Sequence, residues 1–139
     1  MAQTRKTLAT ILVADDDEAI LRAARTALEK AGFAVKTARD GKEAYQHLQS
    51  DTFAAAIFDV AMPHIEGRDL VRYMQSEKRL MKIPVIIMTA DLKARLSSES
   101  LLAGAVAFLP KPFTDMQLMT TLGMFVRSDA DATVEAEAD

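Results

Sequence analysis

The sequence predicts an α/β protein with a doubly wound, five-stranded parallel sheet and helices on both of its faces. Three observations lead to this prediction. Five short apolar segments alternate with five predicted helices, three of which have apolar residues at helical spacing. The connections between them are short, and Gly, Pro and Asp mark several of them. The central apolar segment ends in Asp59 and is followed by Pro63, as expected of a buried strand that runs into a loop.

The predicted strands are short apolar segments, and the fourth is rich in β-branched residues, which favour strands. They span residues 8–14, 33–38, 54–59, 84–89 and 106–109. Strands that alternate with helices in this way form right-handed crossovers. We therefore expect a three-layer α/β/α arrangement with the flavodoxin-like strand order 2-1-3-4-5.

Local signals mark the predicted helices. Acidic residues 15–18 can cap the first helix, and Gly32 ends it. Asp40 and Glu43 have the spacing of a helix start, and this second helix ends near Ser50. Apolar residues at helical spacing predict helices at residues 68–77 and 114–127, and a polar helix is expected at residues 92–103, before Gly104.

Composition indicates one domain and narrows the function. The chain has 139 residues, of which half are apolar, enough for one substantial core. It has no cysteine, which excludes disulfides, thiol catalysis and thiolate metal sites. The apolar segment 8–14 is too short for a membrane span or a signal peptide, so we expect a cytoplasmic protein that does not bind membranes.

The charges are distributed unevenly along the chain. The formal net charge is −3, but residues 128–139 carry five acidic groups and no basic one, so residues 1–127 carry +2. A nearly neutral folded region argues against direct binding of nucleic acid. We expect residues 1–7 to be a flexible N-terminus, residues 8–127 to form the domain, and the acidic tail at 128–139 to be disordered.

Polar side chains follow four of the predicted strands. Asp15 and Asp16 follow the first, Asp59 ends the third, Thr89 ends the fourth, and Lys111 follows the fifth. Because the carboxyl ends of parallel strands lie at one edge of a sheet, these residues are expected to meet in one crevice. Each has an ordinary alternative role, as a helix cap, a strand end or a solvated loop charge, but all of these would have to hold together.

The residue types predict the chemistry of this crevice. Three carboxylates without His or Cys favour a hard cation, above all Mg²⁺, with Mn²⁺ as a second candidate. One carboxylate remains available as a nucleophile, while a lysine and a threonine can contact phosphoryl oxygens. The set therefore suits transfer of a phosphoryl group onto a carboxylate.

Four motifs in order resemble the receiver domain of response regulators from bacterial two-component signal transduction systems. The resemblance covers residues 8–127. The motifs are residues 11–17 (ILVADDD), residues 59–63 (DVAMP) with Gly67, residues 88–90 (MTA), and residues 103–105 (AGA) with 108–113 (FLPKPF).

The resemblance implies a role for each residue of the crevice. Asp59 would be the phosphoacceptor, which takes a phosphoryl group from a phosphohistidine. Asp16 would bind Mg²⁺ directly and Asp15 through a water molecule, together with Asp59 and the backbone carbonyl of Ala61. The Lys111-Pro112 peptide bond is expected to be cis by the same resemblance.

The resemblance also implies a switch. Thr89 and Lys111 would reorient toward the phosphoryl group, and Phe108, in the position of the family's switch aromatic, would turn inward as Thr89 moves. Ala61 and Asp91 occupy positions that vary within the family and flank the phosphoryl group. We expect both to alter the lifetime of the phosphorylated state.

The implied partners are a histidine kinase or a histidine phosphotransfer protein upstream. An unknown protein downstream would bind the face formed by the fourth helix, fifth strand and fifth helix. The protein would assist its own phosphorylation and dephosphorylation without turning over a separate substrate. We expect a stand-alone, single-domain response regulator that signals through protein contacts or relays the phosphate.

Three other interpretations remain open. The chain could be the receiver fragment of a longer regulator, or an interaction module with the same fold that works without phosphorylation. It could also be a metal-dependent phosphohydrolase with an aspartyl intermediate. The last would need a second acid two residues after the nucleophile, where this chain has Ala61.

Overall fold

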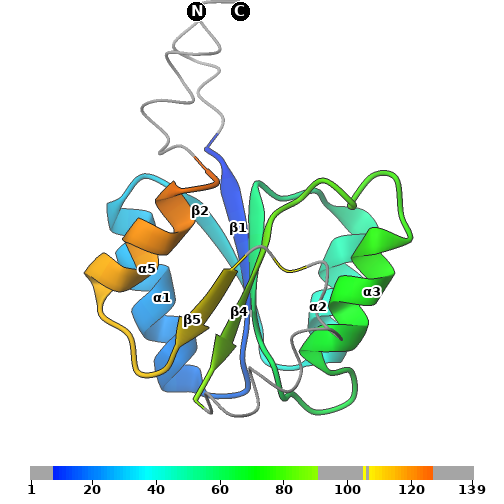
Figure 1. The fold of residues 1–139 in the computed structure, drawn as a ribbon, viewed down its shortest axis with the longest axis horizontal. Coiled ribbons are helices and arrows are strands. Elements are labelled where there is room, and N and C mark those ends of the chain that lie inside the picture. The colour runs from blue at the N-terminus through cyan, green and yellow to red at the C-terminus, as the bar shows by residue number, and fades with distance from the viewer. Residues whose placement is uncertain (1–7, 91–104, 106, 127–139) are drawn as a thin grey trace, which may run out of the picture.

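Five parallel strands form one sheet in the order β2-β1-β3-β4-β5 (Figure 1). The computed structural model describes residues 8–90, 105 and 107–126. In that part of the chain the strands are β1 (Thr10–Ala14), β2 (Ala34–Ala38), β3 (Ala55–Asp59), β4 (Val85–Thr89) and β5 (Ala107–Pro110). The helices are α1 (Glu18–Lys30), α2 (Gly41–Ser50), α3 (Gly67–Gln75) and α5 (Asp115–Gly123). The predicted fold class and strand order are confirmed.

The sheet lies between two helical layers, with α1 and α5 on one face and α2 and α3 on the other (Figure 1). Strand residues alternate between these layers because successive side chains point to opposite faces. In β1, Ile11 and Val13 pack with the α1 and α5 residues, while Leu12 and Ala14 pack with those of α2 and α3. All residues of β3 and β4 are buried, as predicted for central strands.

The first two helices begin at the predicted capping residues. The Asp17 carboxylate accepts a hydrogen bond from the Ala19 amide at 2.9 Å, and Asp40 accepts one from the Glu43 amide at 2.8 Å. These side chains satisfy amides that have no partner inside the helix. Each cap follows the carboxyl end of a strand, so the turn from strand to helix is fixed at the edge where the polar residues gather.

Two helix predictions differ in outcome from the rest. The predicted helix at 92–103 lies outside the described residues. The last helix was predicted to reach about residue 127, but α5 ends at Gly123 and the chain then turns at Met124 and Phe125. Glycine is a poor helix former, and the apolar residues that follow it were misassigned to the helix by their spacing.

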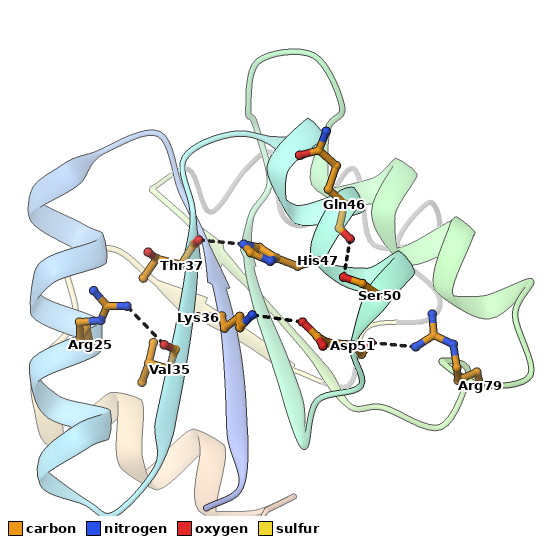
Figure 2. Close-up of polar contacts among 9 residues, drawn as sticks. All are labelled: Arg25, Val35, Lys36, Thr37, Gln46, His47, Ser50, Asp51 and Arg79. Carbon is orange, nitrogen blue, oxygen red and sulfur yellow. Dashed lines mark hydrogen bonds and ion pairs between the residues drawn. The ribbon is translucent and has the colours of Figure 1, made fainter.

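Side chains from neighbouring segments make polar contacts with backbone carbonyls of the edge strand β2 and of the end of α2 (Figure 2). Arg25 of α1 donates to the Val35 carbonyl, and His47 of α2 lies 3.3 Å from the Thr37 carbonyl. Arg79 donates to the carbonyls of Leu48 and Asp51 at the end of α2.

Within the residues that the structure describes, every helix is too short or too polar to span a bilayer.

Candidate functional site

Four neighbouring strands deliver the predicted polar residues to one edge of the sheet. Asp15 directly follows β1, Asp59 is the last residue of β3, Thr89 is the last of β4, and Lys111 directly follows β5. The Lys111 amide donates to the Thr89 carbonyl at 2.8 Å, so the ends of β4 and β5 are tied together. The prediction that these strand ends share an edge is therefore correct.

Three carboxylates form a cluster at this edge. One oxygen from each of Asp15, Asp16 and Asp59 lies within 4.8 Å of the other two. Asp15 is fully buried and Asp59 is 8% exposed, whereas Asp16 is exposed. The cluster thus has a buried floor and one carboxylate toward solvent, which leaves a route by which a hydrated cation can reach it.

Lys111 bridges the two buried carboxylates. Its Nζ lies 2.6 Å from Oδ2 of Asp15 and 3.0 Å from Oδ1 of Asp59, and its side chain is only 15% exposed. Oδ2 of Asp15 has no other polar partner among the described residues. Two like charges at this separation repel each other, and the Lys111 ammonium places an opposite charge in contact with both carboxylates.

The pKa values of the pair reflect burial and pairing. Burial raises the pKa of Asp59 above its ordinary value, the nearby Asp15 charge raises it further, and the Lys111 ammonium opposes both only in part. Burial alone would lower the pKa of Lys111, but hydrogen bonds to Asp15 and Asp59 outweigh it, so the net direction is upward. The net effect is that the fold disfavours the charged form of the Asp59 carboxylate.

The donor set fits a hard divalent cation. The cluster offers only carboxylate oxygens, which Mg²⁺ and Mn²⁺ accept and which soft metals disfavour. A divalent cation would neutralise charge that the single Lys111 ammonium leaves unbalanced. The described part of the chain thus contains an acidic cluster suited to Mg²⁺ at the carboxyl edge of the sheet.

The remaining predicted residues differ in burial, and one of them lies outside the described part of the chain. Thr89 is buried, with 3% of its surface exposed. Ala61 is exposed in the loop between β3 and α3, and Phe108 of β5 is partly buried against the core beneath α2 and α3. Asp91 lies outside the described residues. The Lys111-Pro112 peptide bond is cis, as expected.

Sequence reasoning missed two glycines that bring helix starts onto the loop after Asp59. A Cβ at Gly67 would lie 2.6 Å from the Asp59 carbonyl oxygen, and a Cβ at Gly41 would lie 2.6 Å from the Ile65 Cβ. Gly67 was noted only as part of a motif. For Gly41 the sequence offers no signal beyond the neighbouring helix cap, because the close contact joins segments that are distant in the chain.

The fold and the cluster together define a class: doubly wound α/β proteins whose strand ends form an acidic cation site with a partly buried lysine. Comparison with known proteins gives the family within this class. The family model described as the response regulator receiver domain matches residues 11–123. The chain therefore belongs to the response regulator receiver domain family, whose members act as phosphorylation switches in two-component signalling.

Individual relatives agree with this assignment. Response regulator MprA of Mycolicibacterium vanbaalenii is 34% identical over 117 residues, which are 84% of this chain and 50% of that protein. The chemotaxis response regulator CheY4 of Vibrio cholerae has a similar structure, with a TM-score of 0.80 and 31% identity, over 86% of this chain and 100% of CheY4.

A third relative is a receiver domain from another kind of signalling protein. The receiver domain of a signal transduction histidine kinase from Syntrophus aciditrophicus matches with a TM-score of 0.77 and 30% identity, over 84% of this chain and 89% of that domain. The chain spans about half the length of the curated relatives it matches. Similar domains thus occur in proteins of different overall organisation.

Proposed function

We propose that Asp59 is the phosphoacceptor of a cytoplasmic response regulator. Its carboxylate would attack the phosphorus of a phosphohistidine on a histidine kinase or a histidine phosphotransfer protein. A P–O bond to Asp59 forms, the P–N bond breaks, and the imidazole leaves with the bonding electron pair and takes up a proton. The observation that carries the proposal is the position of Asp59 at the end of β3, beside two further carboxylates and Lys111.

The proposal assigns Mg²⁺ to the acidic cluster. Asp16 would bind it directly, Asp15 through water, and Asp59 and the Ala61 carbonyl would complete the protein ligands. A bound Mg²⁺ supplies positive charge that stabilises the transferring phosphoryl group. The exposure of Asp16 and the oxygen-only donor set support this assignment.

Lys111 would have a second position after phosphorylation. In the unphosphorylated structure its ammonium contacts Asp15 and Asp59. A phosphoryl group on Asp59 brings further negative charge to the same place, so Lys111 can exchange a carboxylate contact for a phosphoryl oxygen without leaving the site. The 15% exposure of its side chain supports a role inside the pocket over that of a solvated loop charge.

The switch would run from Thr89 to Phe108. Thr89 ends β4, and Phe108 lies on the adjacent strand β5, paired with Ile87. A movement of Thr89 toward the phosphoryl group would make room on this side of the sheet for the ring of Phe108, and the change would reach the surface of β5 and α5. Unchanged Phe108 ring signals and unchanged α5 amide signals in NMR spectra of the phosphorylated protein would exclude this route.

The phosphoryl lifetime would depend on residues beside the phosphoacceptor. Ala61 carries no group that can orient an attacking water molecule, whereas Asp91 would add negative charge nearby. We expect the decay rate of the phosphorylated protein to differ between wild type and Asp91→Ala. Equal decay rates would remove Asp91 from the proposal.

We also propose how the protein passes on its signal and which face binds its downstream partner. Because a similar domain makes up the whole solved chain of CheY4 and about half of the longer MprA, the output could pass through protein contacts, onward phosphotransfer or a further domain. We propose that the downstream partner binds the face to which β5 and α5 contribute. The exposed Met116 and Met124 support this, because methionines adapt to varied partner surfaces.

The test is phosphorylation by a small donor. Purified wild type, Asp59→Asn and the matched control Asp115→Asn are incubated with Mg²⁺ and acetyl phosphate, and intact mass is followed. We expect one base-labile phosphoryl group on wild type and on Asp115→Asn, and none on Asp59→Asn. Phosphorylation of Asp59→Asn would exclude Asp59 as the acceptor. No phosphorylation of a folded, Mg²⁺-binding wild type would favour an interaction module that works without phosphate, or a receiver that accepts only from its kinase.

A further inference from the structure

The loop at residues 60–66, which follows the phosphoacceptor, is closed at its base and anchored in the core. The Gly67 amide donates a hydrogen bond to the Val60 carbonyl at 3.2 Å, so the two ends of the loop meet. Met62, near the middle, is 7% exposed and packs in the core cluster beneath α2 and α3. Short loops with such contacts hold a defined shape. Ala61 therefore lies in a segment whose backbone is fixed on both sides.

The far side of this loop contains a strained turn. His64 has a φ of 73°, which is unusual for a residue with a side chain. The Ile65 amide donates to the Pro63 carbonyl at 2.9 Å, across only one intervening residue. A three-residue turn with positive φ is rare because it is strained, and it persists only where its surroundings hold it.

The first residue of α2 supplies that support. The Gly41 amide donates to the Pro63 carbonyl at 3.3 Å, the same oxygen that accepts from Ile65. A Cβ on Gly41 would overlap the Ile65 carbonyl oxygen and would lie 2.6 Å from the Ile65 Cβ. Helix and turn can therefore pack this closely only because residue 41 has no side chain.

The side chain of His64 contributes little to this contact. Its Nε2 lies 3.9 Å from Oδ2 of Asp40, and the side chain is 63% exposed. An exposed ion pair at that distance is weak. The backbone of the turn and the absence of a Cβ at Gly41 are thus the features that fix the loop.

We propose that Gly41 is a positioning residue for the cation site: by supporting the turn at His64 it holds the loop that presents the Ala61 carbonyl to the metal. This inference rests on the proposed Mg²⁺ site. It predicts that a change in the first turn of α2, which contributes no ligand, alters metal affinity. The reason is that displacement of residues 63–65 moves the backbone that continues into Ala61.

The first test compares two glycine-to-alanine variants in helices. Gly41→Ala places a methyl group against Ile65, whereas Gly123→Ala meets nothing within 4 Å. Mn²⁺ affinity is measured from the free-ion signal in electron paramagnetic resonance, and Mg²⁺ affinity by competition. We expect Gly41→Ala to bind both ions about tenfold more weakly than wild type, and Gly123→Ala to bind like wild type. Equal affinity of a folded Gly41→Ala and wild type would overturn the proposal.

The second test holds even if Gly41→Ala does not fold. Both His64→Gly and His64→Val remove the imidazole, but only glycine accepts a positive φ without strain. We expect His64→Gly to bind Mn²⁺ like wild type and His64→Val to bind at least about threefold more weakly. Equal affinities of the two variants would show that the turn conformation does not act on the metal site, and would overturn the proposal.

Failure of the proposed function has a different signature. If folded wild type bound neither Mn²⁺ nor Mg²⁺, or if Asp59→Asn bound them as wild type does, the assignment of the cation site itself would be wrong. Metal binding by wild type that is weakened in Asp59→Asn but not in Gly41→Ala or His64→Val would retain the site and remove only the positioning role.

Discussion

Asp59 is buried and Lys111 is partly buried, and the surroundings affect their charges in opposite directions. Burial raises the pKa of Asp59, and Lys111 only partly offsets this. For Lys111, the hydrogen bonds to Asp15 and Asp59 outweigh burial, and the pKa rises. The ionised carboxylate is thus less favourable in the folded protein than in the unfolded chain, while the ammonium is more favourable. This residue-scale asymmetry predicts how each substitution changes stability.

Asp59→Asn should stabilise the metal-free protein at pH 7. The folded pKa of Asp59 lies above the unfolded value, so ionisation weakens the fold, and this cost disappears as the pH falls through the folded pKa toward the unfolded one. We expect the free energy of unfolding in urea to rise on the order of 1 kcal/mol at neutral pH, with a difference that vanishes near pH ~4. The exposed variant Asp115→Asn serves as control. A gain that stays constant down to that pH would contradict the prediction.

Lys111→Gln should have the opposite effect. A raised folded pKa means that the ammonium stabilises the fold at all pH values below its unfolded pKa, and this contribution is lost as the pH rises through the folded pKa. Without the ammonium, Asp15 and Asp59 face each other with no cation between them. We expect the metal-free variant to lose about 2 kcal/mol of unfolding free energy at pH 7. If chemical denaturation showed a loss of less than a third of this free energy, solvent would already screen the interaction of Lys111 with the two carboxylates.

At the scale of elements, the site follows from the ends of the strands. The strand assignments came from apolar segments and from the polar residues that end them, and those signals are local in sequence. Parallel topology then places Asp15, Asp59, Thr89 and Lys111 at one edge, which is why these positions could be predicted. The bridge from Lys111 to both carboxylates could not, because it depends on side-chain distances that a sequence pattern does not contain.

Contacts between distant segments account for the other features that the sequence did not predict. Gly41 and Ile65 belong to different elements, and nothing near either residue indicates that they touch. The positive φ of His64 lies in the same turn, beside that contact. The early end of α5 has a local cause in Gly123, but apolar residues beyond it continued the helical spacing and masked the stop.

The end of α2 offers a test of one such contact. Arg79, in the segment between α3 and β4, donates to the Asp51 carbonyl (Figure 2) and also to the Leu48 carbonyl. These are carbonyls that α2 itself leaves without partners. A guanidinium there also interacts favourably with the negative end of the helix dipole. We expect Arg79→Ala to lower the unfolding free energy by about 1 kcal/mol. Arg72→Ala, an exposed substitution on α3, should change it by less than about 0.5 kcal/mol. If the two variants lowered the unfolding free energy equally in urea titrations, Arg79 would not be a cap of α2.

At the scale of the whole molecule, the acidic cluster links segments that are far apart in the chain. Asp15 and Asp16 follow β1, Asp59 ends β3, and Lys111 follows β5, so the cluster exists only when the sheet is assembled. A cation that binds the cluster therefore binds the folded state and not the unfolded chain. Its binding free energy adds directly to stability, as for any ligand selective for the native state.

The variant Asp16→Asn distinguishes the stability that Mg²⁺ binding adds from the stability of the metal-free protein. Asp16 is exposed and, unlike Asp15 and Asp59, makes no ion pair with Lys111 in the described structure. Its neutralisation should change metal-free stability by less than about 0.5 kcal/mol. In wild type, each tenfold increase in Mg²⁺ above the dissociation constant should add about 1.4 kcal/mol to the free energy of unfolding.

In Asp16→Asn the same gain should begin only at Mg²⁺ concentrations about tenfold higher or more, because a direct ligand has lost its charge. Thermal unfolding over a series of MgCl₂ concentrations at constant ionic strength, with Asp115→Asn as control, measures this displacement. Constant ionic strength matters because exposed charges are screened by added salt whether or not a site is occupied. If Asp16→Asn and wild type gained stability at the same Mg²⁺ concentrations, the cation would not bind through Asp16. The Mg²⁺ assignment would then have to move to the buried pair alone, where Lys111 already competes for the same oxygens.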